Sequence, residues 1–202
     1  MEQIPGVLDA VQSRQPASGI QKAVSPTLLQ YLYPTDLRTH IIKRVGLDPD
    51  FVFPDELYRV LKSVGSHLSM AWLKTVTGSW VTSGRTRQSI DVFQHQRFLH
   101  ACILGCGAGG DCWNHYGSCV VLWSAIQNKI PRFQLSPHLP TILGFSAPSR
   151  DQILGVALAY FTYHSLRLQS NVSDAVLTAT VHKQFAYHIG PLVQSPVQPG
   201  VF

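Results

Sequence analysis

Residues 102–119 read CILGCGAGGDCWNHYGSC and contain all 4 cysteines of the chain. Three of these cysteines combine with one histidine in the spacing C-x3-C-x8-H-x3-C, formed by Cys102, Cys106, His115 and Cys119. Thiolate and imidazole groups are ligands that zinc prefers, and four of them close a tetrahedron without leaving a position for substrate. The pattern therefore predicts one structural Zn²⁺ site, which organises the surrounding fold.

Glycines at positions 105, 107, 109 and 110 surround the second cysteine. Glycine adopts positive φ angles without steric cost, so these residues suit a tight turn that lets Cys102 and Cys106 bind one metal ion. His115 and Cys119 are four residues apart and would project from one face at the start of a helix. The ligand set has alternatives: Cys112 could replace Cys106 or Cys119, His95 or His100 could compete, and the cysteines could be ordinary buried residues.

The same glycines match the dinucleotide-binding pattern G-x-G-x-x-G through Gly105, Gly107 and Gly110. That fold needs an acid about 20 residues further on to bind the ribose, and a second βαβ unit. No Asp or Glu occurs between Asp111 and Asp151, and no second unit follows. The sequence thus disfavours a nucleotide cofactor. No nucleophile and base stand out as a pair either, so we expect a non-catalytic protein with no small-molecule substrate.

The chain of 202 residues is poor in charge, with only 13% charged residues against roughly a quarter in typical soluble domains. Such a surface is typical of a chain that packs against a partner. The 16 Lys and Arg exceed the 11 Asp and Glu, which gives a net charge of +5. No acid lies between Cys112 and Arg150, so this stretch is the best local candidate for a surface that faces phosphate.

The first residues, MEQIPGVLDAVQ, lack the basic and apolar regions of a secretory signal. The longest uncharged apolar stretch, residues 152–166, is shorter than the roughly 20 residues that a membrane span needs. Closely spaced cysteines in such a chain favour metal ligation in a reducing compartment over disulfides. We therefore expect an intracellular protein, in the nucleus or cytoplasm, with no membrane span.

Apolar periodicity and capping residues predict a mainly α fold, a small helical domain with one zinc-knuckle insertion and at most a short β-hairpin near residues 99–108. Helices are expected from Pro26 to Pro34, from Thr35 to Gly46, and over 54–64, 66–77, 150–168 and 174–189, with a short one near 89–95. The predicted divisions are a flexible arm (1–24), a helical region (25–97), the zinc knuckle (98–125), a Pro-rich linker (126–148), a C-terminal helical pair (149–192) and a loose tail (193–202).

The C-terminal helical pair has the clearest local signals. Ser149 and Gln152 form a capping box, in which each side chain is expected to bond a backbone N–H at the helix start. The helix that follows is apolar nearly all round, which predicts burial. Gly190 and Pro191 end the second helix. The two helices are expected to pack through Phe161, Leu166, Leu177, Val181 and Phe185.

The pattern of residues resembles the cysteine and histidine knuckle C-terminal to the polymerase in reverse transcriptases of non-LTR retrotransposons. The resemblance rests on Cys102, Cys106, Asp111, His115-Tyr116, Cys119 and Leu122-Trp123, on Ala71-Trp72-Leu73-Lys74-Thr75 with Gly78 to Arg85, and on Tyr163 to Arg167. It covers roughly residues 57–190. Val120 departs from it, since a proline often follows the last cysteine. No polymerase motif with two aspartates is present, so the chain looks like a detached or truncated tail.

The resemblance implies a zinc-stabilised module that holds RNA or DNA. In that case Arg85, Arg87, Arg97, Lys129 and Arg132 would contact phosphates, which give affinity with little sequence preference. The alternative is a structural or protein-interaction subunit that packs its charge-poor surface against other subunits and binds no nucleic acid. A single cluster of the basic residues near the metal would favour the first hypothesis, and scattered positions would favour the second.

Overall fold

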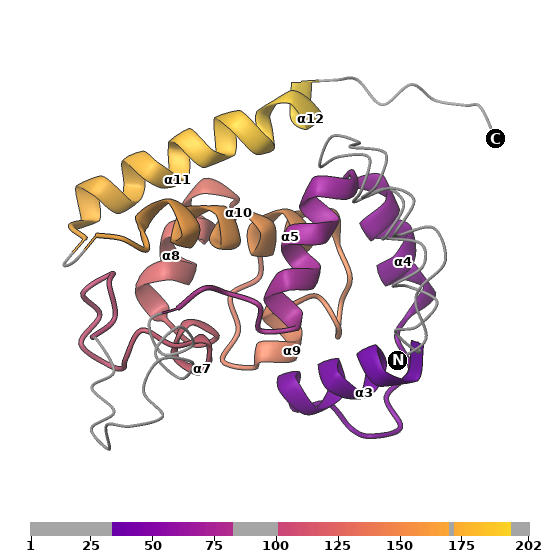
Figure 1. The fold of residues 1–202 in the computed structure, drawn as a ribbon. Helices are drawn as coiled ribbons and strands as arrows, with labels where there is room; N and C mark the ends of the chain where they lie inside the picture. Colours follow the sequence, from indigo (N-terminus) through magenta and orange to yellow (C-terminus); the bar gives the residue numbers. More distant parts are fainter. Residues whose placement is uncertain (1–33, 83–100, 170–171, 195–202) are drawn as a thin grey trace, which may run out of the picture.

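A computed structural model describes residues 34–82, 101–169 and 172–194, and this part of the chain is mainly helical, as predicted (Figure 1). Its helices are α3 (Pro34–Val45), α4 (Asp55–Ser63), α5 (Ser66–Val76), α7 (Trp113–Tyr116), α8 (Val120–Lys129), α9 (Leu139–Ile142), α10 (Arg150–Leu166), α11 (Asp174–His188) and α12 (Gly190–Gln194). Within these ranges there is no sheet, and one isolated antiparallel bridge joins Ala101 and Gly110. None of the described helices is long and apolar enough to cross a membrane.

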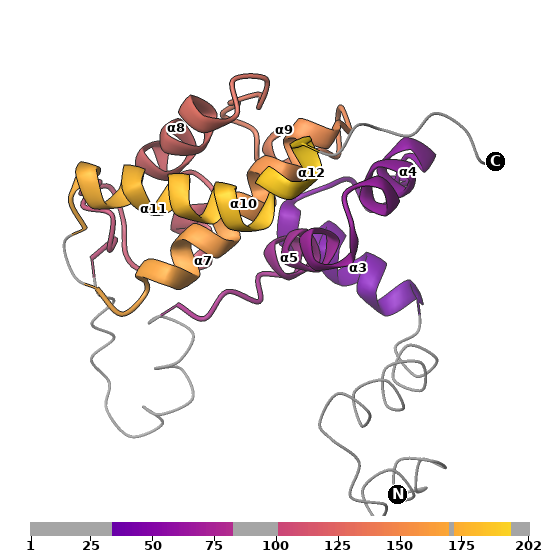
Figure 2. The same ribbon diagram turned by 90° about the horizontal axis from the view of Figure 1, so that it is seen from above.

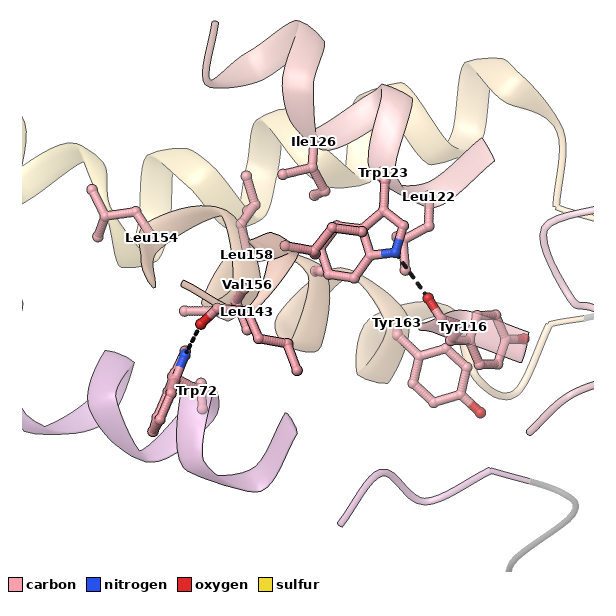
Figure 3. Close-up of a cluster of buried hydrophobic side chains, with 14 of the residues drawn as sticks. Trp72, Tyr116, Leu122, Trp123, Ile126, Leu143, Leu154, Val156, Leu158 and Tyr163 are labelled. Carbon is pink, nitrogen blue, oxygen red and sulfur yellow. Dashed lines mark hydrogen bonds between the residues drawn. The ribbon is translucent and has the colours of Figure 1, made fainter. Parts of the chain in front are cut away.

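Helix α10 is the centre of the fold, and α4, α5, α8 and α11 pack against it (Figures 1 and 2). Its residues from 152 to 159 are all buried, which agrees with the predicted apolar surface on every side. Gly155 faces the ring of Phe133, and a Cβ atom there would overlap that ring. The glycine therefore lets the loop after α8 lie directly on α10. Figure 3 shows part of this core, including the bond from Trp72 Nε1 to the carbonyl oxygen of Leu143 (2.9 Å).

The N-terminal helices begin where the sequence predicts them. Pro54 is the N-cap of α4, and Asp55 and Glu56 occupy its first turn, where the helix dipole favours acids. Gly65, with φ of 86°, separates α4 from α5. The two helices bury Leu57, Val60, Leu68, Ala71, Trp72 and Val76.

The C-terminal helices α10 and α11 pack against each other, and the side chains expected between them all belong to one core. Leu166, Leu177 and Val181 are buried. Phe161 and Phe185 are partly buried at its edge, where Phe161 stacks on His188 with ring centroids 3.7 Å apart. The ends of both helices lie within two residues of the expected positions.

The capping box at the start of α10 forms only in part. The Ser149 hydroxyl accepts a hydrogen bond from the Gln152 backbone N–H (3.1 Å), as expected. The Gln152 side chain, however, donates to the carbonyl of Ile142 (2.6 Å) and accepts from the backbone N–H of Gln134 (3.0 Å). It is only 1% exposed, so it serves as a buried polar anchor for residues 134–142 and is not available to the helix end.

The stretch 126–148, expected to be a linker, contains the end of α8 and the short helix α9. Its residues Phe133, Ile142, Leu143 and Phe145 are buried, so this stretch contributes to the core. Pro140 lies in the first turn of α9, a position that proline tolerates. The expected arm, the helix from Pro26, the short helix near 89–95 and residues 195–202 of the expected tail lie outside the described ranges. Residues 193 and 194 of that tail belong to α12, which begins at Gly190, so the helical part of the chain continues beyond the predicted end.

Candidate metal centre

The first two ligands lie on a hairpin turn. The backbone N–H of Cys102 donates to the carbonyl of Gly109 (2.9 Å), next to the bridge between Ala101 and Gly110. Between these ends, Gly105 and Gly107 both have φ of 68°, in the left-handed region that favours glycine. The turn therefore brings Cys102 and Cys106 to the same side, and the expected short hairpin is reduced to this one bridge.

The other two ligands come from two helices, not from one face of a single helix as expected. His115 lies in the four-residue helix α7, and Cys119 is the N-cap of α8. The chain turns between them at Gly117 and Ser118, where the Ser118 N–H donates to the His115 carbonyl (2.9 Å). Gly109 faces the His115 ring so closely that a Cβ atom there would overlap it. Because residue 109 has no side chain, the hairpin packs directly against the His115 ring, which lies next to the cysteines.

The structure brings Cys102, Cys106, His115 and Cys119 together, with all four ligand atoms within 4.8 Å of one another. Cys106 Sγ and His115 Nε2 lie 3.1 Å apart. Sulfur and nitrogen ligand atoms around tetrahedral zinc are separated by about 3.5–3.8 Å, so a small rearrangement of the side chains would complete the tetrahedron. All four cysteines of the chain are free thiols, and Cys112 does not belong to this group. The four predicted residues can therefore bind a metal ion, whereas the alternatives His95 and His100 lie outside the described ranges.

Burial and hydrogen bonding shift the pKa values of Cys102 and Cys119 in opposite directions. Cys102 and Cys119 are buried, whereas Cys106 and His115 are half-buried. A hydrogen bond from the Cys119 thiol lowers the pKa of Cys102, and this bond, together with burial, raises the pKa of Cys119. A divalent cation at this position would bond both sulfurs in place of thiol protons, which is how thiolate sites couple metal binding to proton release.

A buried carboxylate lies beside this centre. Asp111 is 3% exposed, and the Tyr163 hydroxyl donates to it (2.8 Å). Trp80 is fully buried next to it, stacked on Tyr163 with ring centroids 4.8 Å apart and on Tyr116 at 5.7 Å. The sequence pattern included Asp111 but gave no indication of these partners. Tyr163 is 52 residues away in the chain, so no local signal could have revealed the contact.

The predicted phosphate contacts are only partly described. Arg85, Arg87 and Arg97 lie outside the described ranges. Lys129 ends α8, and its Nζ lies 3.3 Å from His182 Nδ1 and 4.5 Å from the centre of the Phe185 ring. Arg132 is exposed just beyond. Since α8 separates Lys129 from Cys119 by about 15 Å, these two cations are not next to the metal ligands.

The glycine pattern of a dinucleotide site forms no such site here. Gly105 and Gly107 belong to the turn, and Gly110 pairs in antiparallel fashion with Ala101. Among the described residues there is no parallel strand pair, and the helix after Gly110 is the single-turn α7.

Comparisons of the chain with protein-family models, with curated proteins and with solved structures found no match.

Proposed function

We propose that this chain is a non-catalytic, zinc-stabilised module that binds RNA or DNA through phosphate contacts, related to the C-terminal tail of a retrotransposon reverse transcriptase. The observation that carries the proposal is the convergence of Cys102, Cys106, His115 and Cys119. Three thiolates and one imidazole are a donor set typical of structural zinc. With four protein ligands, the ion has no position left for a substrate.

A group of cations on α8 and α11 supports the nucleic-acid part of the proposal. This α8–α11 patch consists of Lys129 at the end of α8, the exposed Arg132 just beyond it, and the exposed Lys183 of α11, which follows His182, the neighbour of Lys129. Lys129 is held between the two helices by His182 and by the ring of Phe185, so its charge has a defined position. No acid occurs from residue 112 to 150 or after Asp174, and Asp174 is about 12 Å from His182 along α11. The patch therefore suits a polyanion such as a phosphodiester backbone.

A second candidate function is a protein-interaction subunit. The outer side of α11 exposes Val176 (40%) and Tyr187 (76%), together with the small residues Ala175, Ala179 and Ala186. A helix face of this kind fits a protein partner better than it fits phosphate.

The test uses zinc-loaded protein, fluorescently labelled single- and double-stranded RNA and DNA, and anisotropy over a range of salt concentrations. Five phosphate contacts predict that log affinity falls with log salt at a slope of about −3.5 to −4.5. Replacing Arg132 and Lys183 together by alanine should flatten the slope by about 1.4–1.8, for all sequences alike.

The matched control is the double substitution of Lys43 and Lys62 by alanine. It removes the same charge from α3 and α4, which lie away from α8 and α11 in both views (Figures 1 and 2). This control should keep the slope of the unchanged protein. If the zinc-loaded protein binds no nucleic acid at low salt, the nucleic-acid proposal is wrong and the interaction subunit takes its place. Equal effects of both double substitutions would show that only net charge matters.

A further inference from the structure

A chain of buried hydrogen bonds and ring contacts joins both halves of the metal centre to α10. The Ile103 backbone N–H, on the hairpin, donates to the Tyr116 hydroxyl (3.3 Å). The Tyr116 ring packs on the Tyr163 ring, with ring centroids 4.7 Å apart. The hydroxyl of Tyr163, on α10, donates to the Asp111 carboxylate (2.8 Å). Figure 3 shows the two tyrosine rings next to each other below Trp123.

Each member of this chain has one consistent role. Burial is the main cause that raises the pKa of both Tyr116 and Tyr163, and the charge of Asp111 raises it further. The Tyr163 phenol therefore keeps its proton and donates it to the carboxylate. A buried carboxylate that accepts a hydrogen bond from a buried phenol can stay at this position at a lower cost than an unpaired one.

Asp111 lies at the end of the hairpin that carries two of the candidate ligands, so its hydrogen bond affects where those ligands lie. Asp111 follows directly on Gly110, which closes the hairpin that carries Cys102 and Cys106. Tyr116 follows directly on His115 in α7, and its carbonyl accepts the bond from Trp123 Nε1 of α8 (2.9 Å, Figure 3). Asp111 thus fixes the end of the hairpin to Tyr163 of α10, and Tyr163 packs on Tyr116, which bonds the hairpin at Ile103 and lies next to His115.

We propose that Asp111 is a positioning residue of the metal centre, which sets metal affinity by holding the hairpin ligands and the helix ligands in register against Tyr163 of α10. This inference rests on the zinc site of the proposed function. Its physical basis is that the four ligand atoms already lie close together, so binding requires little reorganisation while the clamp is intact. The negative charge of Asp111 also favours a cation nearby over a neutral, protonated set of thiols. Groups that orient direct ligands typically contribute 10–100-fold to metal affinity.

The experiment measures zinc affinity by competition with a chromogenic chelator, and ligand geometry by the visible absorption of the Co²⁺-loaded protein. Asp111→Asn should lower zinc affinity by about 10–100-fold and weaken the tetrahedral Co²⁺ bands. Tyr163→Phe keeps the buried ring and removes one donor, so it should lower affinity by about 2–10-fold. The second variant decides the question if Asp111→Asn does not fold.

Two controls separate positioning from general stability. Thr162 is fully buried beside Tyr163, and its Oγ1 has no hydrogen-bond partner among the described residues, so Thr162→Val makes a conservative change on the same helix. Trp72→Phe removes a buried bond, to the Leu143 carbonyl, from a helix that contributes no metal ligand. Both should leave zinc affinity within about twofold of the unchanged protein, even where Trp72→Phe lowers the denaturation midpoint.

Three outcomes distinguish this inference from the proposed function. Tight zinc binding by the unchanged protein together with a selective loss in the Asp111 and Tyr163 variants supports both. Tight zinc binding with affinities within twofold in all four variants overturns the role of Asp111 and leaves the zinc site intact. No stoichiometric zinc in the unchanged protein overturns the zinc site and, with it, the role of Asp111.

Discussion

Replacing Gly109 by alanine should displace His115 from the metal centre. A Cβ atom at residue 109 would lie 2.7 Å from Cγ of the His115 ring and against its Nδ1, whereas ordinary contact begins at 3.4 Å. The ring must therefore move by about 0.7 Å, the difference between these two distances. Zinc–ligand distances hold to within about 0.2 Å, so a shift of this size breaks the bond from His115.

The loss of one ligand of four should lower zinc affinity by at least about 100-fold, the upper end for groups that only orient ligands. This corresponds to about 2.8 kcal/mol, at about 1.4 kcal/mol per tenfold change. Competition with a chromogenic chelator measures the ratio directly. The Co²⁺-loaded variant should also lose the absorption of a four-coordinate thiolate site.

Gly117→Ala is the matched control, because it makes the same change between the two helices that carry ligands. Its Cβ atom would meet a methyl group of Leu139 at 3.3 Å, which a flexible side chain can accommodate, and φ of −57° suits alanine. This variant should bind zinc within about threefold of the unchanged protein. Equal zinc affinities of the Gly109 and Gly117 variants would refute the argument, since His115 would then either tolerate the shift or not be a ligand.

Cys106→Ser should abolish zinc binding while Cys112→Ser retains it, as measured by zinc content per chain; the reverse result would make Cys112 the ligand. Gln152→Ala should lower the free energy of unfolding in urea by about 2–4 kcal/mol, because buried backbone groups lose their partners. A loss below about 1 kcal/mol would contradict its role as an anchor. Burial lowers the pKa of His164 from 6.5, and the charge of Arg167 lowers it further. Folding therefore favours the neutral form of His164. Its contribution to the free energy of unfolding is complete above pH 6.5 and is lost as the pH falls through the lower folded pKa. Between about pH 7.5 and 5.5 the urea midpoint should therefore fall more in the unchanged protein than in His164→Gln, and equal falls would exclude this residue as the cause.

The sequence alone predicted α3, α4, α5, α10 and α11, but not α8, and it predicted the four residues that the structure brings together. The starts of α4, α10 and α11 are fixed by residues next to them in the chain, namely Pro54, Ser149 and Ser173. Their capping and apolar spacing are local properties, so the pattern located them without knowledge of the fold. The spacing of Cys102, Cys106, His115 and Cys119 is equally local, but it left Cys112 open as a substitute, and only the structure places Cys112 outside the group.

The tertiary structure alone decided which buried polar groups meet. The backbone N–H of Gln152 makes the expected capping hydrogen bond with Ser149, but the Gln152 side chain bonds Gln134, 18 residues away. Asp111 meets Tyr163 at a separation of 52 residues. The spacing of apolar residues and the capping residues report on neighbours within one or two helical turns. They carry no information about which distant group will bond a buried donor or acceptor. These pairings follow from the packing of α10 against the hairpin and the loop after α8, because a polar group in that interior must find its partner there.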